Sequence, residues 1–185
     1  GVGNSMKATI TTAESVIAAD EYAYIAQLVE AQNVQNLSYG SSAAKQITLS
    51  FYVKSSVTGT FAVGLYKPDN TAQIHNLTYT INSASTWEYK TLTFAANTLS
   101  GGAIDDNNGV GLYVNWHLAA GGNYKGGGST SGWSSYASNR RCYNHYQRYL
   151  SINRRSARSR RHRHGLRASV IWSGACFVSK VLLSG

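Results

Sequence analysis

The sequence contains few of the residues whose abundance would point to particular classes of protein. It has one Pro, one Met and two Cys in 185 residues, and residues 139–185 contain no Asp or Glu. Cys142 and Cys176 can pair, but two scattered cysteines make no disulfide framework and say little about redox compartment. No apolar run approaches the ~20 residues that a membrane-spanning helix needs, and no secretory signal is visible. We therefore expect no membrane partner.

Motifs that carry catalytic chemistry are also missing. The chain has no G-x-S-x-G, no phosphate-binding loop and no zinc pattern. Glycoside hydrolysis needs two carboxyl groups about 5 to 9 Å apart across a cleft, whereas Asp105-Asp106 and Asp20-Glu21 are adjacent pairs that suit turns. Calcium needs several convergent oxygens, and no spacing shows them. The sequence predicts a protein that is not an enzyme and has no cofactor, with a structural Ca²⁺ left open.

Charge is distributed unevenly along the chain, whose formal net charge is +9. Residues 1–138 hold six Lys and eight Asp or Glu, a net charge of −2, whereas residues 139–185 hold ten Arg and one Lys, a net charge of +11. We therefore divide the chain into one domain, 1–138, which is long enough to bury a core, and a basic segment, 139–185. The first residue is Gly1, which predicts a fragment or a processed chain.

Residues 45–94 have the two-residue alternation of β-strands. In residues 47–54, the apolar side chains fall on one face and the polar ones on the other, as in a strand that packs on a core. Turn residues separate this strand from its successors near positions 59, 69 and 83. Short strands at this spacing predict a β-sandwich or barrel. The inward set is Ile47, Leu49, Phe51, Val53, Phe61, Val63, Leu65, Leu77, Tyr79 and Ile81.

Three other stretches bear on the strand assignment. In residues 87–94, Trp87 and Tyr89 fall on one face but Leu92 and Phe94 on the other, which predicts a β-bulge or a strand that crosses between sheets. Residues 109–119 alternate clearly, and Trp116, like Trp87, shares the phase of the core. Residues 13–37 are ambiguous, because 22–30 alternates although the propensities favour a helix.

The runs 46–60, 79–93 and 109–121 resemble the jelly-roll domains of bacteriophage tail fibres and related virion appendages. Those domains are similar in turn to cellulase-type carbohydrate-binding modules, and the resemblance covers about residues 6–138. It implies an all-β fold, a jelly-roll or two-sheet antiparallel β-sandwich with an Arg-rich C-terminal extension, and a strand at 22–30. It also implies a place in a virion tail or surface appendage, other virion proteins as partners, and a homotrimer.

The C-terminal part departs from this resemblance. Residues 177–185 only faintly match the closing strand of the family, although residues 170–184 are apolar and can supply such a strand. The simultaneous loss of acids and rise in Arg leads to the hypothesis that residues after about 140 come from a shifted reading frame or a recent replacement. Sequencing the encoding nucleic acid tests this hypothesis; an intact frame with similar tails in relatives would remove it.

Outward aromatic side chains are the candidate glycan-binding residues. Tyr52, Tyr66 and Tyr113 lie opposite the core set, with Asn115 and His117 beside the last. Aromatic rings stack on sugar rings, and amides hydrogen-bond the hydroxyl groups; the alternative is that tyrosine simply favours strands. The glycine-rich loop at 121–132 adds a second guess, because loops on a rigid sandwich are common binding positions. Its candidates are Tyr124 and Trp133.

An arginine tract forms the third candidate site. It has the charge density of a nucleic-acid-binding segment, and nearby tyrosines could add stacking. A solvated disordered tail or a frame artefact explains the same composition, and we rank these two explanations together above nucleic-acid binding. The residues are Arg154, Arg155, Arg158, Arg160, Arg161 and Arg163.

Three functions therefore stay open. The first is a non-catalytic carbohydrate-binding-like module of a virion appendage that recognises host surface glycans. The second is a structural domain that assembles or decorates the particle and binds no sugar. The third, ranked last, is a nucleic-acid binder that uses the arginine tract.

Overall fold

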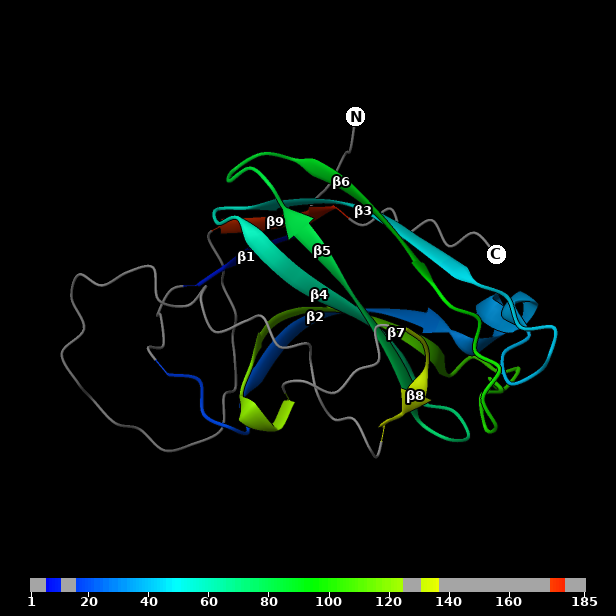
Figure 1. The fold of residues 1–185 in the computed structure, drawn as a ribbon. Coiled ribbons are helices and arrows are strands. Elements are labelled where there is room, and N and C mark those ends of the chain that lie inside the picture. Colours follow the sequence, from blue (N-terminus) through cyan, green and yellow to red (C-terminus); the bar gives the residue numbers. More distant parts are fainter. Residues whose placement is uncertain (1–5, 11–15, 125–130, 137–173, 179–185) are drawn as a thin grey trace.

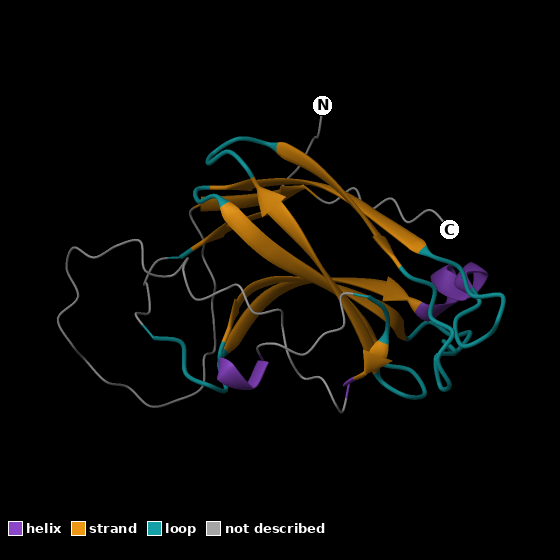
Figure 2. Cartoon of the chain, viewed as in Figure 1, coloured by secondary structure: helices purple, strands orange, loops and turns teal. Residues whose placement is uncertain are grey.

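Two antiparallel β-sheets pack face to face in the computed structural model, which describes residues 6–10, 16–124, 131–136 and 174–178 (Figure 1, Figure 2). Two short 3-10 helices, η1 (Ala31–Leu37) and η2 (Gly122–Tyr124), accompany the sheets. The strands are β1 (Met6–Thr9), β2 (Tyr22–Glu30), β3 (Ile47–Ser55), β4 (Gly59–Lys67), β5 (Gln73–Ile81), β6 (Glu88–Phe94), β7 (Val110–Ala120), β8 (Ser134–Ser135) and β9 (Gly174–Val178).

The strand order is that of a jelly roll. The four-stranded sheet has the order β1-β9-β3-β6, and the five-stranded sheet has the order β2-β7-β4-β5-β8. The chain therefore crosses between the sheets repeatedly instead of completing one sheet before the other, as in double Greek-key sandwiches. This confirms the predicted all-β, two-sheet fold. The strand expected within residues 170–184 is β9, which pairs with both β1 and β3.

The core lies between the inner faces of the two sheets. Side chains of the predicted inward set meet there, and Phe51 of β3 packs edge-on against Tyr79 of β5 and Trp116 of β7, with ring centroids 5.1 and 5.6 Å away. Burial of these apolar groups supplies the main driving force for folding. Fully buried members of this core include Ile47, Leu49, Val53, Val63, Leu65, Phe94, Leu112 and Val114.

The predicted change of phase in residues 87–94 is wrong. β6 pairs with β3 without interruption, and Leu92 and Phe94 face inward. Tyr89 is 54% exposed and Trp87, which precedes the strand, is 41% exposed. The apolar residues at the end of the strand set its inward face, so both aromatic side chains lie outside the core and Trp87 is not a core residue.

The ambiguous stretch contains both of the structures that its sequence suggested. Residues 22–30 form strand β2, as the resemblance implied, with register irregularities after Ala23 and after Val29. The helical tendency appears immediately afterwards in η1, which buries Ala31, Val34 and Leu37. Figure 1 shows η1 at one end of the sandwich. Tertiary packing determines which part of the stretch forms a strand and which part forms a helix, because intrinsic helix propensity is easily overridden by tertiary context.

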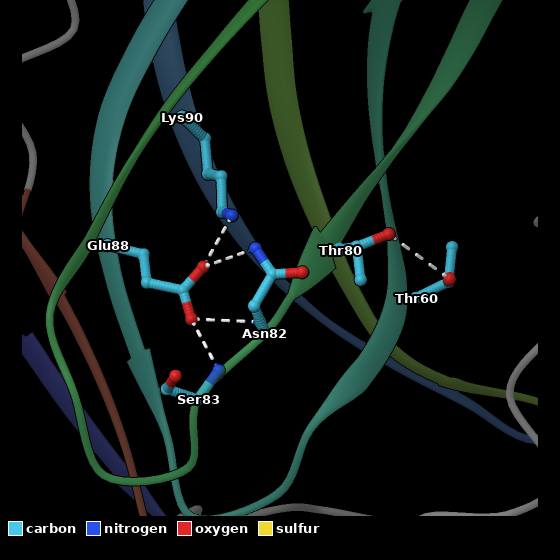
Figure 3. A network of polar contacts seen from close by, with 6 residues as sticks. All are labelled: Thr60, Thr80, Asn82, Ser83, Glu88 and Lys90. Carbon is cyan, nitrogen blue, oxygen red and sulfur yellow. Dashed lines mark hydrogen bonds and ion pairs between the residues drawn. The ribbon is translucent and has the colours of Figure 1, made fainter.

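One carboxylate fastens the turn between β5 and β6 (Figure 3). Lys90 Nζ lies 2.6 Å from Glu88 Oε2, and the backbone amides of Asn82 and Ser83 each donate to Glu88 Oε1 at 2.8 Å. Asn82 Nδ2 donates to Oε2 at 3.2 Å. The hydrogen bond from Lys90, followed by that from Ser83, lowers the pKa of Glu88 to about 2, because these donors favour the ionised form.

We expect Glu88→Gln to lower the thermal unfolding midpoint near neutral pH. Because the folded-state pKa is depressed, the stabilisation is complete above the ordinary value of 4.5 and is lost as the pH falls toward 2. Circular dichroism melts should therefore show the parent and variant midpoints converging over this range. Asp106→Asn, which removes an exposed carboxylate, is the matched control. A difference between parent and Glu88→Gln that stays constant down to pH 2 would contradict this account.

Candidate functional site

The outer face of the five-stranded sheet carries a first group of tyrosine side chains, the β4–β7 cluster, made of Tyr66, Tyr113 and Tyr136. Tyr66 and Tyr113 are register partners on adjacent strands, and their ring centroids lie 5.5 Å apart. Tyr136 follows β8, and its ring lies 4.8 Å from that of Tyr66. All three side chains are half-buried, so each ring is held by its neighbours and still presents part of its surface to solvent.

A second group, the β2 cluster, lies farther along the same face and consists of Tyr22, Tyr24 and Tyr124. The rings of Tyr22 and Tyr24 stack with centroids 5.6 Å apart, and Tyr124 of η2 lies 4.7 Å from Tyr22. Tyr24 also meets the edge of His117, its register partner on β7, at 6.5 Å. The irregularity after Ala23 brings two consecutive outward tyrosines close enough to stack.

Small and polar side chains form the floor between the two clusters. Asn115 of β7 is the register partner of Ala26 on β2 and of Gly64 on β4, and Gly64 is in turn the partner of Asn76 on β5. An added Cβ at Gly64 would lie 2.2 Å from Asn76 Oδ1 and 3.2 Å from His117 Nε2. The absence of a side chain at Gly64 therefore leaves room for the Asn76 amide and the His117 imidazole to pack against its backbone.

The floor polar groups are neutral and largely buried. Asn76 is fully buried, and Asn115 is half-buried. Asn115 Oδ1 makes no hydrogen bond within the part of the chain that the structure describes. Burial lowers the pKa of His117 to about 4, so the imidazole carries no charge near neutral pH.

The four long strands of this sheet carry few charged side chains, and none lies between the two tyrosine clusters. The charged residues of β2, β4, β5 and β7 are Glu30 and Lys67. Glu30 follows the second irregularity in β2 and accepts a hydrogen bond from Gln32, whereas the side chain of Lys67 is buried. The two tyrosine clusters are four residues apart along β7, or about 13 Å. Figure 1 shows β2 and β7 bowed toward the other sheet, which makes this outer face concave.

The structure brings together most, but not all, of the predicted glycan-binding residues. Tyr66, Tyr113 and Asn115 lie side by side, and Tyr124 belongs to the β2 cluster. Tyr52 lies on β3, in the other sheet, and so on the opposite side of the molecule. Alternation separates inward from outward positions but does not say to which sheet a strand belongs, which explains the misplacement.

Trp133 is a core residue and not the surface contact that its loop position predicted. It is 8% exposed, and its Nε1 donates to the carbonyl of Ala95 at 2.8 Å. Its ring meets the edges of Tyr39 and His75 at 5.3 and 5.9 Å. This large aromatic side chain is buried although it follows a glycine-rich segment, because the sandwich offers it both apolar neighbours and an acceptor for its N–H.

Sequence reasoning missed Tyr22, Tyr24 and Tyr136. The first two are alternate residues of a segment that alternates throughout, so the assignment of 22–30 as a strand already implied an aromatic pair on one face. No pattern marks Tyr136, because β8 has two residues and its neighbour Tyr66 is distant in sequence.

A buried ammonium group lies between the β4–β5 turn and the loop before β7. Lys67 is fully buried, and its Nζ donates to the carbonyls of Asp69, Gly101 and Ala103, the last two at 2.9 and 3.3 Å. Burial lowers the pKa of Lys67, and the nearby Asp69 and Asp105 oppose that effect. Lys67 thereby ties the β4–β5 turn to the loop before β7.

Three expectations from the sequence remain: those on metal ions, on the membrane and on the arginine tract. Within the described ranges, no group of three or more His, Cys, Asp or Glu side chains can hold a metal ion, and the Ca²⁺ stays a prediction. No described helix is both long and apolar enough to cross a membrane. The six arginines of the basic tract lie outside the described residues.

Comparisons with known protein families, with curated proteins and with solved structures gave no match for this chain.

We expect Lys67→Met to lower the free energy of unfolding by about 3 kcal/mol, because it leaves buried carbonyls without a donor while keeping the side-chain volume. Urea unfolding followed by tryptophan fluorescence measures the change. Lys45→Met is the matched control, since Lys45 is exposed, and such surface changes are usually within about 0.5 kcal/mol. Equal stability of Lys67→Met and the parent would show that the carbonyls do not depend on the ammonium group.

We expect Gly64→Ala to displace the Asn76 amide while keeping the fold, because the new methyl group would overlap Asn76 Oδ1. The side-chain amide resonances of Asn76 should move in a two-dimensional NMR spectrum, and the melting temperature should fall by a few degrees. Gly122→Ala is the control, because its nearest neighbour would lie 3.8 Å away. Unchanged Asn76 resonances would refute the proposed role of Gly64.

Proposed function

We propose that this chain is a non-catalytic carbohydrate-binding module and that the concave outer face of the five-stranded sheet is its glycan site. The observation that supports the proposal is the arrangement of two tyrosine clusters on either side of a neutral amide floor. Tyrosine rings bind the apolar faces of sugars, and amides exchange hydrogen bonds with hydroxyl groups.

The spacing of the clusters favours an oligosaccharide over a single sugar. Tyr113 and His117, which mark the two clusters on β7, are about 13 Å apart along the strand, more than one ring can span. Asn115 lies between them. Its Oδ1 is buried from solvent, so contact with a ligand falls to the exposed part of this half-buried residue.

The neutrality of the face favours an uncharged glycan. A carboxylate or phosphate on the ligand would lose water and find no exposed cation on these four strands, because Lys67 is buried. The described outward positions of this sheet also hold no carboxylate pair of the kind that glycosidases use. This supports binding without hydrolysis.

The resemblance to tail-fibre domains extends the proposal to a virion appendage that recognises a host surface glycan. A shallow face with few polar contacts binds weakly on its own. When several copies are linked, binding of one copy raises the effective concentration of ligand at the others, so the overall affinity increases. A homotrimer, held in a particle by other virion proteins, would gain affinity in this way.

A structural role in particle assembly is the second candidate. Tyr22, Tyr24 and Leu28 are 46–50% exposed on β2, which is an edge strand of its sheet. Exposed apolar groups gathered on an edge often mark contacts between proteins. Nucleic-acid binding through the arginine tract stays a third, lower-ranked hypothesis.

A glycan array followed by calorimetric titration of the hits tests the proposal. Neutral oligosaccharides should bind the parent, and Tyr66→Ala or Tyr113→Ala should each weaken binding about tenfold through loss of a stacking surface. Asn115→Ala should weaken it as well. Tyr52→Ala, on the opposite sheet, is the matched control and should leave affinity for the neutral ligand unchanged.

Two other experimental outcomes would favour the assembly role or nucleic-acid binding instead. Absence of any glycan hit, together with firm binding to another virion protein that Tyr24→Ala weakens, would favour the assembly role. Salt-sensitive nucleic-acid binding that disappears when the six arginines become glutamine would favour the third hypothesis. Truncation at residue 139 cannot serve for this test, because it would remove β9 from between β1 and β3.

A further inference from the structure

The outer face of the four-stranded sheet presents its own aromatic surface, on the opposite side of the molecule from the proposed glycan site. Tyr52 of β3 and Tyr89 of β6 are register partners whose ring centroids lie 4.9 Å apart. They are 42% and 54% exposed. Trp87 is exposed two positions before Tyr89, so an extended chain places it on the same side. We call these three residues the β3–β6 platform.

Two lysines flank the platform on the same face. Lys54 and Lys7 are both register partners of Cys176, one on each side of β9. The adjacent Val53 and Ala8 face the core, and alternation therefore turns both lysines outward. Two strand spacings separate them by about 10 Å. Within the described residues, neither ammonium group makes a hydrogen bond or an ion pair.

The described strands of this sheet place no acidic side chain on this face to balance the two lysines. The four strands of the sheet contain one acid, Glu88, which has the inward phase of Val53 and is bonded to Lys90. The outward charges of the described strands are therefore positive on this face, whereas the outward residues of the five-stranded sheet between its two tyrosine clusters are uncharged. Charge thus distinguishes the two aromatic surfaces of one small domain.

Hydroxyl groups continue the platform along the same two strands. Thr48 and Thr93 hydroxyls lie 3.2 Å apart across β3 and β6, and Ser50 and Thr91 hydroxyls lie at the same distance. Hydrogen bonding to Ser50 and then Thr91 lowers the pKa of Tyr89, which places the phenol next to this hydroxyl pair. Hydroxyl groups, aromatic rings and a cation therefore follow one another in that order along β3.

We propose that the β3–β6 platform is a second saccharide site, which takes an anionic glycan with carboxylated rings. Tyr52 and Tyr89 stack on a sugar ring, and Lys54 and Lys7 pair with carboxylates on that ring and the next. The proposal does not rest on the glycan site of the five-stranded sheet, and either can fail alone.

A single-stranded nucleic acid is the competing anionic ligand, but the charge count disfavours it. Proteins that bind nucleic acids firmly neutralise several phosphates, about 6–10 in strongly salt-dependent cases. The described strands of this face supply two lysines. A glycan with one carboxylate on each ring carries negative charges several ångströms apart, which two lysines can pair with. A nucleic acid carries a continuous row of phosphates, most of which two lysines would leave unpaired.

Calorimetric titration of the full chain with short uronic acid oligomers tests the proposal, with their methyl esters as neutral ligands of the same shape. A panel of glucuronate, galacturonate and mannuronate oligomers covers the ring stereochemistry. We expect an acid oligomer to bind at least tenfold more tightly than its ester. Tyr89→Ala should weaken binding about tenfold, and the double variant Lys7→Gln, Lys54→Gln should do so by a similar factor.

Matched variants separate this site from the other one. Lys45→Gln removes an exposed lysine outside the face and should leave affinity for the acid unchanged, as should Tyr66→Ala. Loss of acid binding in Tyr66→Ala, but not in Tyr89→Ala, would move the ligand to the five-stranded sheet and overturn the proposal. Absence of binding to every acid, equal affinity for acid and ester, or tighter binding of single-stranded DNA would overturn it too.

Discussion

The pairing of β7 with β2 on one side and with β4 on the other is the constraint on which the proposed site depends. One strand fixes the register of both neighbours, and so brings Tyr113 beside Tyr66 and His117 beside Tyr24. The inward residues of the same strand hold it in place, since Leu112 and Val114 are fully buried between the sheets. Burial of one face therefore positions the other face for binding.

The two outer faces differ in charge although they share one fold. The five-stranded sheet shows tyrosines around neutral amides, whereas the four-stranded sheet shows aromatic side chains beside Lys54 and Lys7. In a jelly roll, successive strands cross between the sheets, so residues near in sequence end up on opposite sides. Tyr52 and Tyr66 are an example. This topology lets one short segment contribute to two surfaces with different chemistry.

Much of the fold, but less of the site, could be predicted from the sequence. Alternation identified the inward residues of β3 and β7 because each strand has one face toward solvent and one face buried in the core. It could not assign Tyr52 to a sheet, because sheet membership depends on long-range pairing. Trp87 was misplaced by its phase and Trp133 by its position after the glycine-rich loop, because the exposure of one and the burial of the other follow from tertiary packing. The burial of Lys67 has no local signal, since two of the three carbonyls that its ammonium group contacts come from a distant loop.

Contacts between tyrosine rings in solution test the central claim most directly. Nuclear Overhauser spectroscopy on protein with labelled tyrosines should show cross-peaks between the rings of Tyr66 and Tyr113 and between those of Tyr22 and Tyr24. It should show none between Tyr52 and Tyr113, which lie on opposite sheets. Cross-peaks between Tyr52 and Tyr113, or their absence between Tyr66 and Tyr113, would contradict the register of β7 and the site built on it.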